Sequence, residues 1–342
     1  MPEEHSNESN RRKGVRAGVI IIALAVIAAI AAVIVGVPYV RYQRAGKLMN
    51  EASVDDGASI ARAAIAFGQL GGLKDSRERS LALWDAAAVR ETVSAGMGHL
   101  AVCGSDGLAV ATGVYNEGQC EVDGWTDIIA VSAGGGHTAG LRRDGTVVAV
   151  GRNTNGQCEV SEWTDIVSIS AGGLYTVGLK PDGTVVVAGP EENPALDLSG
   201  WTDIIAVSAG DRHVAGLRSD GTVLAAGEDG YGQCQVENWQ NIVAISAGQL
   251  HTVGLKADGT VVATGWENSG RCGVQDWTGI TAVAAGNDFT LGLRSDGTVV
   301  AAGGNEYGQC DVGGWSGITA ISAGFFSAGV TKDGEILLAG PI

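Results

Sequence analysis

The chain has 342 residues, 54 of them glycine, and carries a formal net charge of −16. Glycine at more than twice its usual share of about 7% disfavours long helices over most of the chain. Residues 1–47 hold seven basic and three acidic residues and carry +4, so the remainder carries −20. An acidic surface of this size repels phosphate backbones, so we expect a solvated surface that aids solubility and no binding of nucleic acid.

The N-terminal part of the chain has the pattern of a membrane anchor. Residues 1–16 are polar and end in a basic cluster, and residues 17–37 then contain no charge over 21 positions. At 1.5 Å per residue this stretch makes a helix of ~31 Å, enough to cross the apolar core of a bilayer. A cleaved signal peptide is the alternative, but its apolar region is shorter and ends in small residues, whereas this one continues into Pro38 and Tyr39. The sequence predicts a polar basic tail over residues 1–16 and an uncleaved transmembrane signal anchor over residues 17–40.

Flanking charge predicts the orientation of this anchor. Four basic residues precede the span, whereas Arg41, Arg44 and Lys47 follow it. Because positive charge favours the cytoplasmic side, the bias of one residue indicates a cytoplasmic N-terminus. We expect a single-pass protein of the cell membrane whose remaining residues are extracellular.

Residues 41–80 are rich in alanine and have a helical pattern. Ile60, Ala64, Ile65 and Phe67 form part of an apolar stripe, and residues 55–57 (DDG) supply a turn. The segment resembles a single tetratricopeptide-like helical pair. One such unit cannot bury its apolar face alone, so we interpret it as a stalk that packs on the following domain or on a second chain.

A repeat of 38 residues organises the rest of the chain, residues 81–342. The glycine that closes each "SAG" or "AAG" recurs at this constant spacing, and a tryptophan keeps the same step. The glycines are Gly96, Gly134, Gly172, Gly210, Gly248, Gly286 and Gly324, and the tryptophans are Trp125, Trp163, Trp201, Trp239, Trp277 and Trp315. A fixed period in this range indicates a repeat architecture.

The inside of one unit indicates β-strands. Residues 128–134, 137–142 and 146–151 are short runs rich in Val, Ile and Thr, and Asp144-Gly145 is a strong hairpin signal between two of them. Residues 157–160 suggest a weaker fourth strand. Four short antiparallel strands, seven times over, predict an all-β fold, a seven-bladed β-propeller. A flat solenoid is disfavoured because no polar capping repeat stands at the C-terminal end.

The register of the repeats leaves the closure of the ring open. The last unit ends at its third strand, residues 335–340, and Trp84 takes the place before Gly96 that Val160 holds before Gly172. Residues 82–84 can supply the missing strand and join the two ends. Alternatively, Trp84 ends the preceding helix.

The unit [SA]AGxxHTxGLxxDGTVxAxGxNxxGQCxVxxW resembles the regulator-of-chromosome-condensation type of propeller repeat, in a bacterial, membrane-anchored form. The resemblance covers residues 89–342 in seven copies. It implies the propeller fold but not by itself the nucleotide-exchange activity of the founding member.

Cysteine, histidine and tryptophan recur at fixed places in the repeat and are predicted to be structural. Ring geometry holds equivalent cysteines beyond the ~7 Å Cα distance that a disulfide requires, so we expect small core residues at Cys103, Cys120, Cys158, Cys234, Cys272 and Cys310. Tyr175 and Phe289 replace the histidine of other units, which favours core or rim histidines with a local hydrogen bond at His99, His137, His213 and His251. The tryptophans are expected to pack between blades. With no catalytic or metal-binding motif found, we expect no catalytic residue, metal ion or cofactor.

Two short segments vary between the units, the pair after each "AG" and the residues before "GQC". Strand direction puts both at one end of the blades, where loops on a rigid scaffold often recognise partners. The residues expected on this protein-binding face are Tyr115, Glu117, Asn153, Tyr175, Asp211, Arg212, Tyr231, Trp266, Glu267, Phe289, Tyr307, Phe325 and Phe326. Aromatic anchors with a polar rim suit protein binding. The alternative is drift in unconstrained loops whose aromatic residues only cover the blade ends.

The leading hypothesis is a membrane-anchored, non-enzymatic module that displays a monomeric propeller on the cell surface. It would bind a protein partner, as an interaction or inhibitory module, and the sequence does not identify that partner. One alternative is an exchange factor for a small GTPase, as in the founding member of the repeat family. Another is a propeller-based lyase or hydrolase, which would need convergent acid and base groups.

Overall fold

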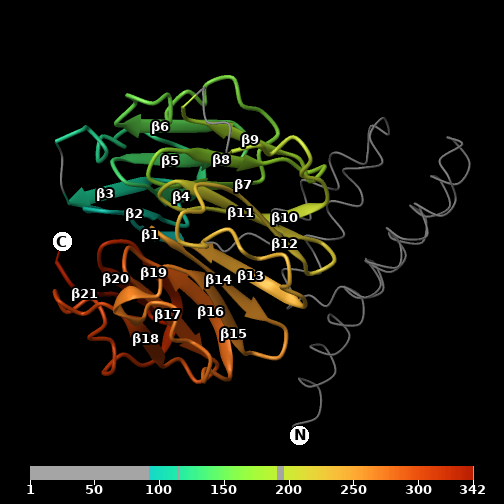
Figure 1. Cartoon of the computed structure of the whole chain (residues 1–342). Helices are drawn as coiled ribbons and strands as arrows, with labels where there is room; N and C mark the ends of the chain where they lie inside the picture. Colours follow the sequence, from blue (N-terminus) through green and yellow to red (C-terminus); the bar gives the residue numbers. More distant parts are fainter. Residues whose placement is uncertain (1–91, 114–115, 191–195, 342) are drawn as a thin grey trace, which may run out of the picture.

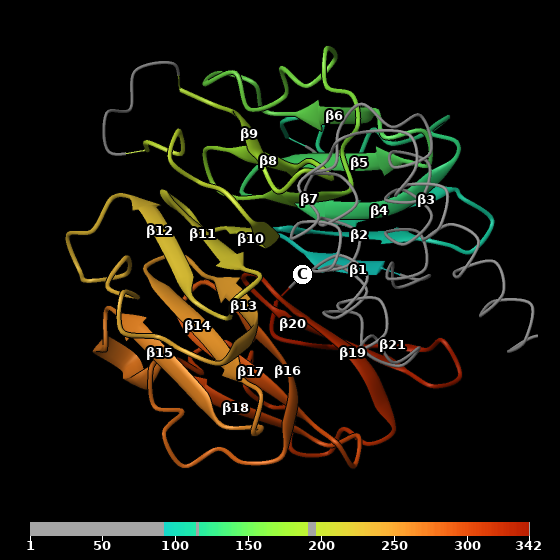
Figure 2. The same ribbon diagram turned by 90° about the vertical axis from the view of Figure 1, so that its right-hand side faces the viewer.

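The computed structural model describes residues 92–113, 116–190 and 196–341. They form seven three-stranded antiparallel sheets around a common axis, each built from three consecutive strands (Figures 1 and 2). We call these sheets blades 1 to 7 in chain order. The predicted all-β, seven-bladed propeller is therefore confirmed for the described part of the chain.

Each blade has an inner, a middle and an outer strand. The inner strands are β1 (Thr92–Ala95), β4 (Ile128–Ala133), β7 (Ser168–Ala171), β10 (Ile204–Ala209), β13 (Ile242–Ala247), β16 (Ile280–Ala285) and β19 (Ile318–Ala323). The middle strands are β2 (His99–Cys103), β5 (His137–Arg142), β8 (Thr176–Leu179), β11 (His213–Arg218), β14 (His251–Lys256), β17 (Phe289–Arg294) and β20 (Ser327–Thr331). The outer strands are β3 (Ala109–Gly113), β6 (Val147–Gly151), β9 (Val185–Ala188), β12 (Val223–Gly227), β15 (Val261–Gly265), β18 (Val299–Gly303) and β21 (Ile336–Ala339). A single short 3-10 helix, η1 (Asn268–Gly270), follows β15 in the described residues.

The register places both variable segments at the same end of each blade. In blade 2, β4 pairs with β5 up to Ala133 and Thr138, and β5 pairs with β6 from His137 and Gly151. The Arg152 N–H, just after β6, donates to the Gly136 carbonyl at 2.8 Å. Equivalent bonds join these two segments in blades 4, 5 and 6. We call this end of the propeller the loop face.

The Asp-Gly hairpins make the opposite end. The Asp144 carboxylate accepts hydrogen bonds from the Thr146 N–H at 2.9 Å and from its hydroxyl at 2.7 Å. The Gly145 carbonyl accepts from the Ile166 N–H of the next blade at 3.0 Å. In blades 1 to 6 each hairpin thus fixes its own turn and the start of the following blade, which explains why its sequence hardly varies.

The predicted fourth strand over residues 157–160 is wrong. Three successive turns replace it, because the Glu159 N–H donates to Gly156, the Val160 N–H to Cys158 and the Trp163 N–H to Val160. These local bonds use the N–H groups that a strand ladder would need. Val160 is nevertheless buried, at 1% exposure, so the segment is a connection that fills the space between two blades.

A closed circle of backbone hydrogen bonds surrounds the axis. The residue after each inner glycine donates its N–H to the inner glycine carbonyl of the next blade, over 2.8 to 3.3 Å. The donors are Met97, Gly135, Gly173, Asp211, Gln249, Asn287 and Phe325, and Phe325 donates to Gly96 in blade 1. The solenoid alternative is therefore wrong, because blade 7 joins blade 1. The residues predicted to close the ring, 82–84, lie outside the described part.

Serine side chains add a second set of bonds between inner strands. The Ser94 hydroxyl accepts from the Ala133 N–H of the next blade at 2.9 Å. The same bond recurs at Ser132, Ser170, Ser208 and Ser246, and Ser322 of blade 7 accepts from Ala95 of blade 1. Blade 6 carries Ala284 at this place, which has no hydroxyl.

The four repeated histidines are buried links between blades, which confirms their predicted structural role. His99 Nε2 lies 2.8 Å from the Thr138 hydroxyl of the next blade, and that hydroxyl donates to the Gln119 carbonyl at 2.7 Å. The imidazole must therefore donate through Nε2. Burial lowers the pKa of His99 to about 4, so the ring is neutral at pH 7. His137, His213 and His251 make the same bond with Thr176, Thr252 and Thr290.

None of the six cysteines forms a disulfide, as predicted. Cys103, Cys120 and Cys272 are buried, and Cys158, Cys234 and Cys310 are half-buried. The Cys103 thiol donates to the Ile128 carbonyl at 3.1 Å. Burial raises the thiol pKa values, to about 11 for Cys158, so these residues are packing groups that stay protonated at neutral pH.

The predicted tail (residues 1–16), anchor (17–40) and stalk (41–80) lie outside the described residues. Within the described part, no helix is long and apolar enough to cross a bilayer.

We expect the propeller to lose stability as the pH falls below about 6.5. Burial lowers the pKa of His99, His137 and His213 to about 4 and that of His251 to about 3. Unfolded histidine, with a pKa of about 6.5, takes up protons that the folded state excludes. The histidine contribution is therefore complete above pH 6.5 and declines toward pH 4, by about 2 kcal/mol per histidine at pH 5. Thermal unfolding from pH 7.5 to 5 measures this slope.

The variant His251→Phe should flatten the slope by about a quarter, because Phe289 fills the equivalent place in blade 6. The control is His5→Phe, which changes a histidine of the N-terminal tail and should leave the slope as it is. Equal slopes for the wild type and His251→Phe would contradict this account.

Candidate protein-binding face

The centre of the loop face is a shallow hollow over the axis. Its cavity has a volume of about 70 Å³, and glycine and alanine from the inner strands line it together with Met97, Asp211, Gln249 and Asn287. Sites for organic ligands usually measure about 300–1,000 Å³. This hollow is therefore too small for such a ligand.

Two aromatic pairs bridge neighbouring blades on the loop face. Tyr231 of blade 4 stacks on Trp266 of blade 5, with ring centroids 5.0 Å apart and planes at 27°. Tyr307 of blade 6 meets Phe325 of blade 7 at 5.6 Å and 40°. Tyr231 and Tyr307 are 51% and 56% exposed, whereas Trp266 and Phe325 are half-buried. Each pair therefore offers one exposed phenol ring backed by a partly buried ring.

Buried glutamines position the two tyrosines. The Tyr231 N–H donates to Gln233 Oε1 at 3.0 Å, and the Tyr307 N–H donates to Gln309 Oε1 at 2.9 Å. Both glutamines, which belong to the repeated "GQC", are at most 2% exposed. The same bond holds Glu117 and Asn155 in blades 1 and 2. The scaffold thus fixes one loop position and leaves its side chain free to differ between blades.

Blade 5 carries Arg271 where the other units that keep this motif have the glutamine. Its guanidinium donates to the carbonyls of Asn268 and Asn287 at 3.2 and 3.0 Å and to the Ser269 hydroxyl at 3.3 Å. It also lies 4.9 Å from the centroid of a Trp266 ring. Burial lowers the pKa of Arg271, and the Asp288 carboxylate opposes that shift. Arg271 is therefore a fixed cation that holds Trp266 and the start of the neighbouring blade.

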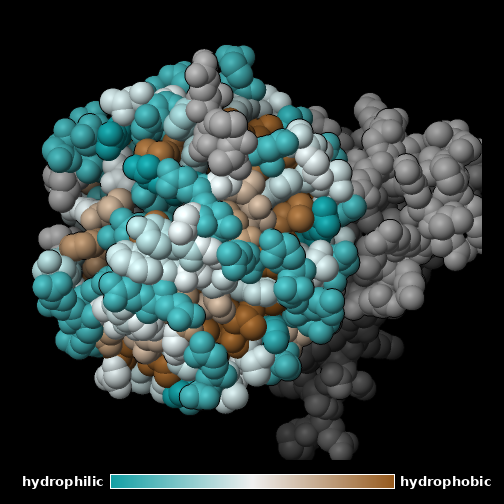
Figure 3. Space-filling model, viewed as in Figure 1, coloured by the Kyte–Doolittle hydropathy of each residue, from teal (hydrophilic) through white to brown (hydrophobic). Residues whose placement is uncertain are grey.

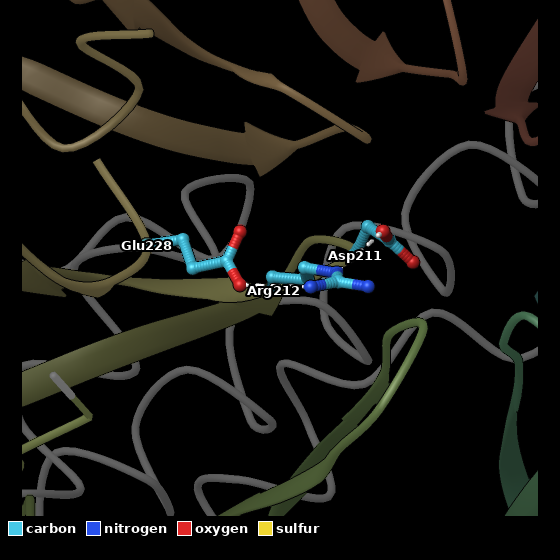
Figure 4. A network of polar contacts seen from close by, with 3 residues as sticks. All are labelled: Asp211, Arg212 and Glu228. Carbon is cyan, nitrogen blue, oxygen red and sulfur yellow. Dashed lines mark hydrogen bonds and ion pairs between the residues drawn. The ribbon is translucent and has the colours of Figure 1, made fainter. Parts of the chain in front are cut away.

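An ion-pair network lies beside these aromatic pairs. Arg212 Nη1 lies 2.9 Å from Glu228 Oε1, and its Nε lies 3.6 Å from Asp211 Oδ2 (Figure 4). Burial raises the pKa of Asp211, while Arg212 acts in the opposite direction. The side chains of Arg212 and Glu228 are each 50% exposed, so the network orders the surface rather than stabilising the core.

Three of the residues predicted on the face are buried in the core instead. Tyr175, Phe289 and Phe326 are at most 1% exposed. They take the place of the buried histidine in blades 3, 6 and 7, where an aromatic ring fills the same slot between blades. In blade 7 the inner turn is one residue shorter, so Phe326 aligns with that histidine and Ser327 with the threonine.

The remaining predicted residues are surface groups or lie outside the described part. Glu117, Asn153, Arg212 and Glu267 are exposed and Asp211 is half-buried. Asn153 holds its own turn, because its Oδ1 accepts from the Cys158 N–H at 2.9 Å. Tyr115 lies outside the described residues. The sequence interpretation missed Arg271, although its replacement of the repeated glutamine is visible in the sequence.

Acidic side chains outnumber basic ones on the loop face. The acidic residues are Glu117, Asp211, Glu228, Asp229, Glu267, Asp288 and Glu306, and the basic residues are Arg152, Arg212 and Arg271. Arg212 is paired with Glu228 and Arg271 is engaged with carbonyl groups, so the net charge presented is negative. Seen from the side shown in Figure 3, hydrophilic residues cover most of the propeller and hydrophobic ones appear only in separate small areas.

No group of three or more His, Cys, Asp or Glu in the described ranges is arranged to hold a metal ion.

Comparison with known proteins supports the assignment of the fold. The pattern of the regulator of chromosome condensation (RCC1) repeat matches residues 128–157, 204–233, 242–271 and 280–309, which lie in blades 2, 4, 5 and 6 and the connections after them. A comparison with curated protein sequences gave no match. Four of the seven blades thus match the RCC1 repeat, which supports an RCC1-type repeat β-propeller.

Solved structures of low sequence identity share this fold. The Crinkly WD40 ectodomain of the receptor kinase ACR4 from Arabidopsis thaliana is 21% identical, with a TM-score of 0.60 over 74% of this chain and 97% of that one. Yeast RCC1 (Prp20) bound to Kap60 is 18% identical, with a TM-score of 0.52 over 62% and 70%. Prp20p from Saccharomyces cerevisiae, described with its binding to Gsp1p and histones, is 17% identical, with a TM-score of 0.52 over 62% and 72%. At these identities the likeness concerns the fold alone.

Removing the guanidinium of Arg271 should destabilise the propeller. In Arg271→Met the carbonyls of Asn268 and Asn287 lose their donor, and we expect a loss of about 2 kcal/mol in denaturant unfolding. Arg212→Met is the matched control, because its exposed ion pairs contribute at most about 1 kcal/mol. Equal effects of the two substitutions would show that Arg271 does not anchor the loop face.

Proposed function

We propose that this protein is a membrane-anchored, non-enzymatic binding module whose propeller recognises a protein partner through the loop face of blades 4 to 7. The observation that carries the proposal is the pair of aromatic contacts between blades, Tyr231 with Trp266 and Tyr307 with Phe325. Each presents an exposed tyrosine whose backbone is fixed by a buried glutamine.

The rigidity of these residues supports a binding role. Tyr and Trp are among the residues that dominate the binding energy of protein interfaces. A side chain that is ordered before binding loses little conformational entropy when the complex forms. Unconstrained drift does not require stacked rings on neighbouring blades, nor an arginine in the place of the repeated glutamine that lies over the Trp266 ring.

The charge of the face indicates the chemistry of the partner. Glu267 and Glu306 are exposed beside the aromatic pairs, and the neighbouring arginines are engaged within the chain. A partner with a basic surface would meet these acids at the rim, and its Lys or Arg side chains could stack on the exposed tyrosine rings. We therefore propose a protein partner with lysine- or arginine-rich contacts.

The fold is compatible with this role. RCC1-type propellers generally act as binding or regulatory modules, and yeast RCC1 is known in a complex with Kap60. Two alternatives stay open, an exchange factor for a small GTPase and a propeller-based lyase or hydrolase. The binding experiment below distinguishes them.

We further propose that residues 17–40 anchor the chain in the cell membrane with the N-terminus in the cytoplasm and the propeller outside. The charge-free stretch and its flanking basic residues support this orientation. Protease added to intact cells should then remove the propeller epitope and spare an epitope tag at the N-terminus. Lysed cells, in which the propeller epitope and the N-terminal tag are both accessible, serve as the control. A propeller protected in intact cells would refute this topology and favour the exchange-factor alternative.

The partner should depend on the aromatic pairs. The full chain in nanodiscs is crosslinked to its partner, the partner is identified and purified, and its affinity is measured. Tyr231→Ala and Trp266→Ala should each weaken binding about 30-fold, the size typical of a central anchor. Added salt should weaken binding further if the partner is basic. The control, Lys332→Ala, changes an exposed residue beside the Asp-Gly hairpin of blade 7, at the opposite end.

Three results would contradict the proposal. Undiminished binding by both alanine variants would place the contact elsewhere. Faster nucleotide release from a small GTPase would favour the exchange factor. A catalytic turnover that is lost when one acidic residue is replaced would favour the enzyme.

A further inference from the structure

The connection before each of blades 2 to 7 packs a tryptophan onto the middle strand of the blade that follows. In blade 2, the Trp125 ring lies against Gly140, where the Cβ of any other residue would meet Trp125 Cζ3 at 2.6 Å. The same contact is 2.4 to 2.8 Å in all six blades. The glycines are Gly140, Gly178, Gly216, Gly254, Gly292 and Gly329, and they face Trp125, Trp163, Trp201, Trp239, Trp277 and Trp315. Glycine at this position is therefore the partner that the indole requires.

Blade 1 differs from the other six on both sides of this contact. Its middle strand carries Val102 where the others have glycine, as the pairing of Val102 with Val93 and Val110 shows. The residue 38 positions before Trp125 is Ala87, and its neighbours in the chain are also alanine. In blade 1 the connection thus has Ala87 in place of tryptophan, and the middle strand has Val102 in place of glycine. This reciprocal exchange is expected only if the two positions touch.

A second exchange of size concerns the other buried residue of the connections. Val122 is 2% exposed and packs with Trp125 between blades 1 and 2. Valine recurs there in the full repeats, also buried, as Val160, Val236, Val274 and Val312. The residue 38 positions before Val122 is Trp84. The segment before blade 1 therefore keeps one indole and one small residue but reverses their order.

Two apolar side chains are exposed at the junction between blades 7 and 1. Leu338 of the outer strand of blade 7 is 38% exposed, and Val110 of the outer strand of blade 1 is 65% exposed. Their counterparts between blades 1 and 2 are Ala111 and Val148, which both pack against the cluster that contains Val122. The two positions that are partly buried at the first junction are thus exposed at the last one.

We propose that residues 81–88 of this chain form the connection between blades 7 and 1, with Trp84 seated between Leu338 and Val110 and Ala87 against Val102. The occupant is a segment of the same chain that ends four residues before β1, so its ends need no long loop to reach the junction. Arg90 stands where the other units have isoleucine, and the proposal therefore stops at Ala88. It does not depend on the proposed function.

A double-mutant cycle on the full chain tests this register. Ala87→Trp should lower the melting temperature by about 5 °C or more, because the new indole collides with Val102. Val102→Gly alone should also lower it, by leaving a gap. The double variant Ala87→Trp/Val102→Gly recreates the pair used by the other six blades and should be more stable than either single variant.

The matched control is the reverse exchange in blade 2, Trp125→Ala with Gly140→Val. These two residues touch, so their coupling sets the size expected for residues in contact. Additive effects of Ala87→Trp and Val102→Gly would overturn the proposal. If Ala87→Trp alone does not fold, recovery of folding in the double variant supports the proposal, and failure to recover overturns it.

Discussion

The close approach of seven backbones at the axis is the constraint on which the rest of the propeller depends. Each inner glycine offers its carbonyl to the N–H of the preceding blade, and a Cβ at Gly134 would lie 2.4 Å from the Gly172 carbonyl. Only glycine permits this circle of hydrogen bonds. The circle joins every blade to the next and holds the first turn of every blade at the same end of the molecule. The loop face is a consequence of that geometry.

Much of the fold could be predicted from the sequence because the signals recur in every unit. The Asp-Gly hairpins, the inner glycines and the spacing of 38 residues predict the blades and the end at which the variable loops lie. The fourth strand could not be predicted correctly. Residues 157–160 have strand-like composition, but local turns use their N–H groups. Gln157 also fixes the segment, because its side chain accepts from the Asn155 N–H and its carbonyl accepts from Thr176 of the next blade.

The candidate site was less predictable, since exposure depends on contacts that cross between blades. Tyr175, Phe289 and Phe326 look like surface aromatics when only their variable neighbours are considered. They are core residues because they replace a histidine whose partner stands 39 residues later in the chain. Where a blade has histidine, the next blade around the ring has threonine at the partner position. Where a blade has Tyr175 or Phe326 instead, the partner position in the next blade holds the apolar Val214 or Leu100. This pairing was present in the sequence and could have placed the three rings in the core.

The bonds between blades are not equally distributed around the ring. Most junctions have a serine bond, a histidine–threonine bond or both. Between blades 6 and 7 neither is possible, because Ala284 has no hydroxyl and Phe289 replaces the histidine. That seam is held by apolar packing, in which Phe289 and Leu291 lie in one cluster with Ala339, and by backbone bonds such as that from Asn287 to Gly324. Gln309, in the connection between the two blades, adds bonds to Asp288 and Ser327. Because this seam lacks both of the bonds that recur at other junctions, we expect local opening of the ring under heat or tension to begin there. Tyr307 and Phe325 lie beside it, at the edge of the surface proposed to meet the partner.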